Sequence, residues 1–280
     1  MTLAEALAQV QARGLPRLEA QMLLLHALDR PSHARAWLLA HDREPLPPEA
    51  GQRLRALTTR RLAGEPIAYL IGSKAFHGLE LQIDARVLDP RDDTETLVDW
   101  ALELLPSDQA SRVLDLGTGS GAIALAIAQQ RPRASVLAVD ASTDALAVAD
   151  ANARRLGLAV ELRHGDWFAP VAGERFDVIV SNPPYIAEAD PHLAALRHDP
   201  RQALASGADG LRDIRRIITS APAHLARGGW LLLEHHGPRA ADRGRLHANP
   251  VTARPGWHRT LHGRLLACNW RRRLTSARVR

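Results

Sequence analysis

The sequence contains a single cysteine, Cys268, among its 280 residues. One cysteine excludes an internal disulfide and a metal site built from several cysteines, and it is typical of a protein in a reducing compartment. No apolar run approaches the roughly 20 residues that a membrane-spanning helix needs. The first residues, MTLAEALAQV, lack the basic and apolar segments of a signal peptide. We therefore expect a cytoplasmic protein without a membrane segment.

Lysine is almost absent, because Lys74 is the only one among 36 basic residues. The net charge of +5 is also unevenly distributed along the chain. Residues 237–280 hold 11 arginines and one acid, whereas residues 1–236 hold 25 basic and 30 acidic residues. The main body thus carries a charge of −5, which disfavours a nucleic-acid groove, and we expect no direct nucleic-acid partner.

Residues 1–73 predict a small N-terminal helical domain. Apolar residues recur there at helical spacing, first at Leu3, Leu7 and Val10 and then at Leu18, Met22, Leu25 and Leu28. A third amphipathic segment covers residues 48–62. Residues 74–91 follow with the alternation of a half-buried strand, in which Leu79, Leu81 and Ile83 are separated by polar residues. This segment predicts a β-hairpin linker between two domains.

Residues 92–236 predict the larger domain. Short apolar runs alternate there with helical stretches; the runs are RVLDLG (112–117), SVLAVD (135–140), AVELRHGD (159–166), FDVIVS (176–181) and GWLLLE (229–234), and the helices cover 122–130, 143–156 and 211–225. Near-continuous apolar strands that alternate with helices indicate a parallel sheet covered on both faces. We therefore predict an α/β fold with a doubly wound, Rossmann-like sheet.

A glycine-rich loop follows the first predicted strand of this domain. It consists of Gly117, Thr118, Gly119, Ser120 and Gly121, and a helix begins directly after it. Glycines allow the backbone to turn tightly and to approach a ligand closely. The spacing GxGxG differs from the dinucleotide fingerprint, and the absence of a following lysine excludes a Walker loop. The loop indicates a nucleotide-like ligand or a simple tight turn.

Acidic residues at the ends of the next two strands favour the ligand. Asp140 ends the second strand, where a carboxylate can accept hydrogen bonds from two ribose hydroxyls. Asp166 and Trp167 follow the third strand, where they can receive the exocyclic amine of an adenine and pack on its ring. A ribose with free hydroxyls suits NAD and S-adenosylmethionine equally well.

The fourth strand is followed by Asn182, Pro183, Pro184 and Tyr185. Two consecutive prolines remove backbone donors, so the Asn182 side-chain oxygen and the Pro183 carbonyl remain as acceptors. Two acceptors beside an aromatic ring suit a planar NH2 group. Such contacts would raise the electron density on its nitrogen and direct the lone pair at an electrophilic methyl group, with Tyr185 fixing the plane. This chemistry requires no metal and no nucleophilic side chain.

These motifs together resemble a known family. DLGTGSGAIALAIA (115–128), Asp140, GDW (165–167) and NPPY (182–185) resemble class I S-adenosylmethionine-dependent methyltransferases that modify NH2 nitrogens. GEPIAYLIGSKAFHGLEL (64–81), PRDDTETLV (90–98) and DPRQALASGADGL (199–211) are similar to peptide-chain release factor glutamine methyltransferases. The resemblance covers roughly residues 1–236. It implies a Rossmann-like methyltransferase domain after a helical substrate-docking domain.

The resemblance also implies a substrate and a division of the site. The substrate would be the glutamine of the Gly-Gly-Gln motif in class 1 release factors, methylated on its side-chain nitrogen. The cofactor S-adenosylmethionine would be bound by Gly117, Thr118, Gly119, Ser120, Gly121, Asp140, Asp166, Trp167 and Asn182. The glutamine would be received by Asn182, Pro183, Pro184 and Tyr185. Thr94 and Glu95 would close over the methionine end, and a monomer is the default expectation.

Residues 237–280 depart from the family, which ends with a further helix and two more strands. Only one short apolar stretch, residues 265–267, is present, so the sequence predicts no pair of strands and an exposed edge on the strand before it. We interpret this arginine-rich tail as a shifted reading frame, with a basic tail that contacts RNA or the ribosome as the alternative.

Three other functions remain open at this point. A glutamine methyltransferase that acts on a large-subunit ribosomal protein would share the same motif. An adenine methyltransferase would need a basic groove for a flipped base, which residues 1–236 do not provide. A protein that binds S-adenosylmethionine but is inactivated by its altered C-terminus would need no substrate.

Overall fold

The computed structural model describes residues 1–235, 256–259 and 265–269. The chain divides into two compact units. The first comprises residues 1–74 and 83–85, and the second comprises residues 75–82 and 86 onward. No helix among the described residues is long and apolar enough to cross a membrane.

The first unit is a bundle of short helices. These are α1 (Leu3–Ala12), α2 (Arg17–Ala27), α3 (Arg35–Ala40), α4 (Pro48–Leu62) and α5 (Ile67–Ile71). Helix α1 begins with a capping box, in which the Glu5 backbone N–H donates to Thr2 Oγ1 over 3.2 Å and the Thr2 N–H donates to Glu5 Oε2 over 2.8 Å. The apolar sides of the helices form one core, which includes Leu3, Val10, Leu23 and Leu54.

A β-hairpin joins the two units. Strands β1 (Ser73–Phe76) and β2 (Leu79–Gln82) form a two-stranded sheet. The turn residues His77 and Gly78 both have positive φ, +46° and +77°, as a tight hairpin turn requires. Asn152 fixes β2 on the second unit, since its Oδ1 accepts from the Gln82 N–H over 2.7 Å and its Nδ2 donates to the Gln82 carbonyl over 3.0 Å.

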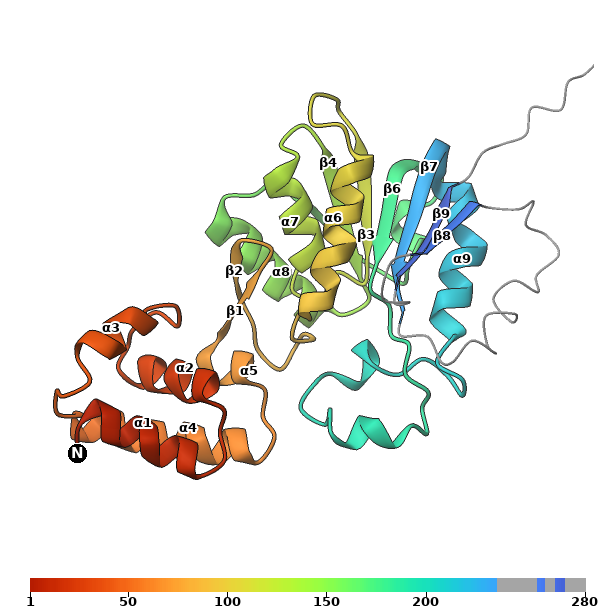
Figure 1. Ribbon diagram of the computed structural model, residues 1–280. Coiled ribbons are helices and arrows are strands. Elements are labelled where there is room, and N and C mark those ends of the chain that lie inside the picture. The colour runs from red at the N-terminus through yellow and green to blue at the C-terminus, as the bar shows by residue number, and fades with distance from the viewer. Residues whose placement is uncertain (236–255, 260–264, 270–280) are drawn as a thin grey trace, which may run out of the picture. The chain divides into compact units, whose positions relative to one another are not determined.

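The second unit contains a seven-stranded sheet in the order β5-β4-β3-β6-β7-β9-β8 (Figure 1). The strands are β3 (Arg112–Leu116), β4 (Ser135–Asp140), β5 (Glu161–His164), β6 (Phe176–Ser181), β7 (Leu225–Glu234), β8 (Gly256–Arg259) and β9 (Leu265–Asn269). The neighbours in the row β5-β4-β3-β6-β7 pair in parallel, whereas β9 runs antiparallel to both β7 and β8. The order runs outward from β3 in two directions. Such a reversal leaves a crevice at the carboxyl ends of the central strands.

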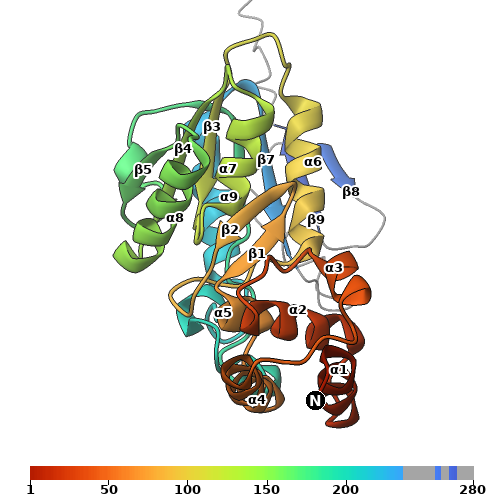
Figure 2. The ribbon, with the colours of Figure 1, turned by 90° about the vertical axis from the view of Figure 1, so that its left-hand side faces the viewer.

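Helices cover both faces of this sheet. They are α6 (Glu95–Leu104), α7 (Ala122–Gln130), α8 (Thr143–Leu156) and α9 (Arg212–His224), with short 3-10 turns η1 (Asp92–Thr94), η2 (Ala169–Val171), η3 (Pro191–Ala194) and η4 (Arg201–Ala203). Helices α6 and α7 pack side by side, and α8 contacts β4 and β5 at the sheet edge that faces the viewer in Figure 2. The predicted Rossmann-like α/β fold is confirmed.

Alternate residues of the central strands build the core under α9. Leu114 and Leu116 of β3 and Leu231 and Leu233 of β7 form one buried cluster with apolar residues of α9 such as Ile217. The side chains between them point to the opposite face, as the two-residue period of a strand requires. A sheet buried on both faces explains the near-continuous apolar runs in the sequence.

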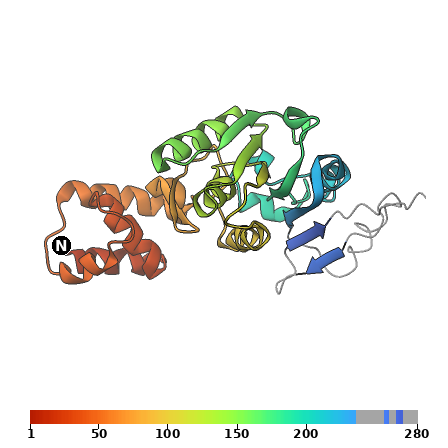
Figure 3. The same ribbon diagram turned by 90° about the horizontal axis from the view of Figure 1, so that it is seen from above.

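The prediction that no pair of strands follows β7 is wrong. Strand β9 pairs with β7 from Trp230↔Asn269 to Glu234↔Leu265, and β8 pairs with β9 in turn (Figure 3). The edge of β7 is therefore covered. Strand β9 contains the one short apolar stretch of the tail, which is long enough to pair with the apolar end of β7. The interpretation of residues 237–280 as a shifted reading frame lies mostly outside the described residues.

Candidate functional site

The glycine loop folds over the carboxyl ends of β3 and β4. The backbone N–H groups of Gly117 and Thr118 both donate to the Val139 carbonyl, over 2.8 Å and 3.1 Å. Gly117 and Gly121 have φ of +71° and +83°, a region that other residues rarely adopt. The loop then leads into α7, which begins at Ala122.

Asp140 ties this loop to the start of α8. Its Oδ2 accepts from the Gly119 N–H over 2.8 Å, and its Oδ1 accepts from the Ser142 N–H over 2.9 Å. A carboxylate oxygen can accept more than one hydrogen bond, so Asp140 retains capacity for a ligand. Two neutral donors thus hold this carboxylate at the end of β4.

A second carboxyl group, Asp115, lies beneath the loop and is fully buried. Thr118 Oγ1 donates to Asp115 Oδ2 over 2.7 Å, whereas Oδ1 has no hydrogen-bonded partner among the described residues. Burial raises the pKa of Asp115 to about 7, and the charge of Asp140 adds to the rise. Asp115 supports the loop from below and does not line a cavity described below.

The turn after β5 brings an aromatic ring to the loop. Trp167 adopts a positive φ of +50°, and a Cβ on Gly117 would lie 3.4 Å from its ring. A Cβ on Gly165 would lie 2.3 Å from Pro170 Cγ, so this position requires glycine. The neighbouring Asp166 Oδ2 forms an ion pair with Arg216 Nη1 of α9 over 2.6 Å.

These strand ends surround a cavity of about 240 Å³, hereafter the first cavity. Seven of the predicted site residues line it: Gly117, Gly119, Asp140, Asp166, Trp167, Asn182 and Pro184. Arg86, Val87 and Leu88, which follow the hairpin, and Asp213 of α9 complete the lining together with other residues. The sequence reasoning gave these four residues no role.

The NPPY segment follows β6 at the same edge of the sheet. Ser181 Oγ donates to the Leu116 carbonyl over 2.7 Å and thereby joins the ends of β6 and β3. Asn182 Nδ2 donates to Thr94 Oγ1 over 3.2 Å. A Cβ on Gly210 would lie 2.3 Å from the Tyr185 carbonyl oxygen, so a glycine supports this segment from behind.

A second cavity of about 260 Å³ also borders Asn182. Its lining includes Arg91, Asp93, Asn182, Tyr185 and Leu204. Burial raises the pKa of Tyr185 to about 12, so its phenol stays neutral at physiological pH. Asn182 borders both cavities together with Leu88 and Ala203, and it is the polar residue of these three, so a ligand in either cavity could form a hydrogen bond with it.

Some predicted residues line neither cavity. Thr118, Ser120 and Gly121 are buried within the loop, and the Ser120 carbonyl accepts from Asn152 Nδ2 over 3.0 Å. Pro183 is likewise buried. These residues shape the loop and the turn around the cavities. Glu95 Oε1 accepts from the backbone N–H of His77 over 2.7 Å, at the hairpin.

Sequence reasoning gave no role to Glu234, the last residue of β7. Its side chain is almost completely buried, with 1% of the residue exposed. Burial raises the pKa of Glu234, while the side chains of Thr94 and Asn182 and the charge of Arg91 act in the opposite direction. The signal was an acid at the last position of a buried parallel strand, the same position that Asp140 occupies on β4. Within the described part of the chain, no cluster of His, Cys, Asp and Glu could hold a metal ion.

Comparisons with protein families match both units. Residues 2–72 match the PrmC N-terminal domain, and residues 94–207 match the methyltransferase small domain. The release factor glutamine methyltransferase of Xylella fastidiosa (strain Temecula1) is 49% identical over 252 residues, 89% of this chain and 90% of that protein. The protein of the same name from Bordetella pertussis is 52% identical, over 79% of this chain and 82% of its own length.

Solved structures show the same fold at low identity. The 16S rRNA N2 G1207 methyltransferase of T. thermophilus, in complex with AdoMet and guanosine, has a TM-score of 0.51 at 22% identity and covers 71% of this chain and 50% of its own. The catalytic domain of hMettl16 has a TM-score of 0.53 at 15% identity, over 79% of this chain and 81% of its own. At such identities the likeness concerns the fold alone.

Proposed function

The chain belongs to the family of release factor glutamine methyltransferases, and from that premise we propose that it methylates the glutamine of the Gly-Gly-Gln motif in class 1 release factors. As a member of this family it is an S-adenosylmethionine-dependent enzyme. The acceptor atom would be the side-chain amide nitrogen of that glutamine. The geometry of the carboxyl edge of the sheet supports this reaction in three steps.

The first cavity suits S-adenosylmethionine. Asp140 ends β4 with a carboxylate that can accept from ribose hydroxyls, and Trp167 offers an aromatic surface beside Gly117. A side chain on Gly117 would fill the space between the loop and that ring. Asp166 would accept a hydrogen bond from the exocyclic amine of the adenine. This contact would replace part of the ion pair between Asp166 and Arg216. Thr118, Ser120 and Gly121 hold the loop in the shape that these contacts need.

The NPPY segment suits the glutamine. The Asn182 side-chain oxygen and the Pro183 carbonyl would accept the two N–H groups of the substrate amide, and Pro184 and Tyr185 would fix its plane. An amide nitrogen is a poor nucleophile because its lone pair is delocalised. Acceptors on both N–H groups raise its electron density and orient it, so the catalysis rests on positioning and electrostatics. When bound, S-adenosylmethionine supplies an electrophilic methyl group, and the amide proton that becomes superfluous leaves to solvent.

The observation that carries this proposal is the place of Asn182 on the border of both cavities. One residue can therefore touch the cofactor from one side and the glutamine from the other. The reaction needs such a residue, since the nitrogen must meet the methyl group in line.

The partner would be a class 1 release factor, docked by the first unit. That unit has its own apolar core, formed by α1 to α5, and contributes no residue to either cavity. A unit without chemistry of its own is suited to hold a protein substrate.

Transfer of labelled methyl from S-adenosylmethionine to a purified release factor tests the proposal. A release factor whose Gly-Gly-Gln glutamine is replaced serves as the control. We expect label in the first protein only. Label in both would place the reaction at another residue, and label in a large-subunit ribosomal protein instead would reassign the substrate.

A further inference from the structure

Asn182 can serve the proposed reaction in only one of two orientations. Its side-chain amide carries an acceptor, Oδ1, on one side and a donor, Nδ2, on the other. A substrate NH2 group offers only donors, so a flipped Asn182 would bring two donors together. Neighbouring groups of the protein must therefore fix which side of the Asn182 amide faces the cavities.

Thr94 is the first neighbour that bears on this choice. Its hydroxyl Oγ1 accepts from Asn182 Nδ2 over 3.2 Å, and the residue is 4% exposed. A hydroxyl can donate as well as accept, so Thr94 alone would satisfy either orientation of the amide. The orientation of the Asn182 amide therefore depends on which group accepts a hydrogen bond from the Thr94 hydroxyl.

Glu234 is the second neighbour. A carboxylate can only accept in its ionised form, which Thr94, Arg91 and Asn182 favour against the burial that raises the pKa of Glu234. Glu234 lies beside Asn182 at the end of β7, because the parallel register pairs Ser181 with Leu233, the residues directly before them. The side chain of Thr94 also acts on its carboxylate. Neither of its oxygens meets a donor at good hydrogen-bond geometry among the described residues. A buried carboxylate without full pairing lowers stability, and its presence needs a compensating role. An acceptor at this place draws the Thr94 hydroxyl proton and the Nδ2 side of Asn182 toward itself.

We propose that Glu234 and Thr94 are positioning residues, which turn Nδ2 of Asn182 away from the cavities and leave Oδ1 for the substrate amide. This inference rests on the proposed function, because it concerns the glutamine that Asn182 would receive. Three elements contribute to the arrangement: Thr94 ends η1 directly before α6, Asn182 follows β6, and Glu234 ends β7. Contacts of α6 with β6 and β7 bring them together.

Variants of both residues test the inference. Thr94→Val removes the hydroxyl at nearly constant volume, and Glu234→Gln replaces the pure acceptor by a group that can also donate. We expect each to lower kcat for release factor methylation by about tenfold or more, the order seen when one oriented hydrogen bond is lost. Binding of S-adenosylmethionine should change little, because the lining of the first cavity includes neither Glu234 nor Thr94, the residue that the resemblance had placed over the methionine end.

Three further measurements separate positioning from a general loss of structure. Thr94→Ser keeps the hydroxyl and should recover most of the loss of Thr94→Val. The double variant should be little worse than the poorer single variant, because both act through Asn182. Glu161→Gln, on the exposed start of β5, is the matched control and should leave kcat unchanged.

The outcomes distinguish this inference from the function on which it rests. Wild-type kcat in both Thr94→Val and Glu234→Gln would overturn the positioning role while leaving the methyltransferase intact. Losses that Thr94→Ser does not recover, together with weaker cofactor binding, would also overturn it. A wild-type enzyme that does not label the release factor would refute the proposed function, and this inference with it.

Discussion

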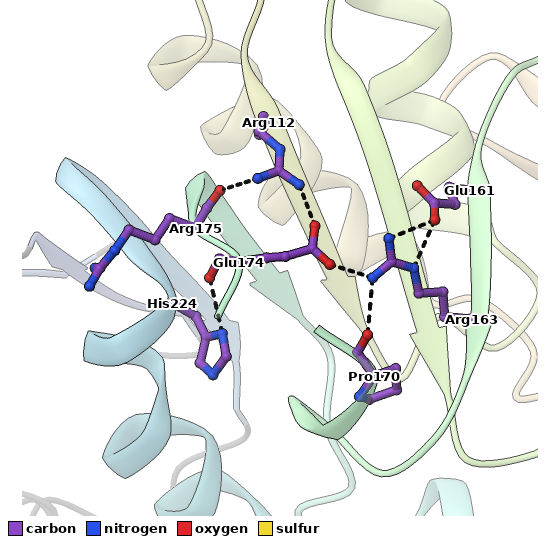
Figure 4. Close-up of polar contacts among 7 residues, drawn as sticks. All are labelled: Arg112, Glu161, Arg163, Pro170, Glu174, Arg175 and His224. Atoms are coloured by element: carbon purple, nitrogen blue, oxygen red, sulfur yellow. Dashed lines mark hydrogen bonds and ion pairs between the residues drawn. The ribbon is translucent and has the colours of Figure 1, made fainter. Parts of the chain in front are cut away.

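Charged side chains are arranged differently at the two ends of the parallel strands, here called the amino edge and the carboxyl edge of the sheet. At the amino ends of the strands, Arg112 at the start of β3 lies with its Nη2 2.5 Å from Oε2 of Glu174, which precedes β6 (Figure 4). Glu174 also pairs with Arg163 of β5, which in turn pairs with Glu161 at the start of that strand. Hydrogen bonds from Arg163 and Arg112 hold the pKa of Glu174 below its usual range. At the carboxyl edge, Asp115 and Glu234 are buried, and burial raises the pKa of both.

The two edges therefore contribute differently to stability and to ligand binding. The ion pairs of the amino edge are partly exposed, so water and salt weaken them and each stabilises the fold only slightly. The carboxyl edge gathers polar groups without full pairing, which lowers stability but leaves hydrogen-bonding capacity for ligands. Substitutions at the two edges should therefore affect different quantities.

The largest effect on activity is expected at Asn182. Asn182→Ala removes the acceptor that borders both cavities, and we expect kcat/KM to fall by about two orders of magnitude or more. Stability should change little, since the side chain has one hydrogen bond, to Thr94, among the described residues. Steady-state kinetics and a urea unfolding curve on the same preparation measure both. A variant that retains activity would remove Asn182 from the reaction.

Gly210→Ala should damage both activity and stability. The new Cβ would lie 2.3 Å from the Tyr185 carbonyl oxygen, so the NPPY segment must move. We expect kcat to fall by about tenfold, since small misplacements of reacting groups are costly. Gly157→Ala is the matched control. The φ of Gly157, +65°, is similar to the +74° of Gly210, but no atom lies within 4 Å of a Cβ added at Gly157. It should lower the free energy of unfolding by about 1 kcal/mol and leave kcat unchanged. Equal losses in the two variants would contradict the argument from close approach.

Asp115 gives the carboxyl edge a pH-dependent stability. The folded protein raises its pKa to about 7 from an ordinary 3.8. Between these values the folded state keeps a proton that the unfolded chain has released, so the free energy of unfolding falls as the pH rises and levels off above pH 7. Asp115→Asn does not titrate, and its stability relative to the wild type should grow between pH 5 and pH 8, by about 3 kcal/mol at most. Urea unfolding at the two pH values tests this, and a constant difference would contradict the buried charge.

The smallest effect is expected at the amino edge. Glu174→Gln weakens the contacts with Arg112 and Arg163, and we expect a slight fall in Tm at low salt with no change in kcat. High salt should remove most of the difference in Tm, because the carboxylate is partly exposed. A loss of activity would show that the two edges are not independent.

The sequence predicted much of the architecture. Helices α4, α7 and α8 and strands β4 and β6 have the predicted bounds, because local signals define them. Examples are Pro48 at the start of α4, the Ser142 cap of α8 and the apolar runs of the strands. The strand ends also placed Asp140, Asp166 and Asn182 around one cavity, since parallel strands bring their carboxyl ends to the same edge.

Other features depend on contacts that sequence patterns do not reveal. In α2 the predicted apolar stripe is right only in part: Leu25 is buried and Leu28 packs against the core, but Leu18 is 50% exposed. The buried residues Leu23 and Leu24 were not predicted. Consecutive leucines make several faces of this helix apolar, and packing against α1 and α4 selects one. Strands β8 and β9 were missed because a short apolar stretch becomes a strand only beside β7. The place of Glu234 depends on Thr94, which is distant in the sequence.

Localisation of the transferred methyl group tests the central claim most directly. A release factor treated with the enzyme and S-adenosylmethionine is digested, and its peptides are sequenced by mass spectrometry, with the Asn182→Ala enzyme in parallel. We predict one methyl group on the side-chain nitrogen of the Gly-Gly-Gln glutamine with the wild-type enzyme, and almost none with the variant. A methyl group on another residue, or equal methylation by the variant, would contradict the account.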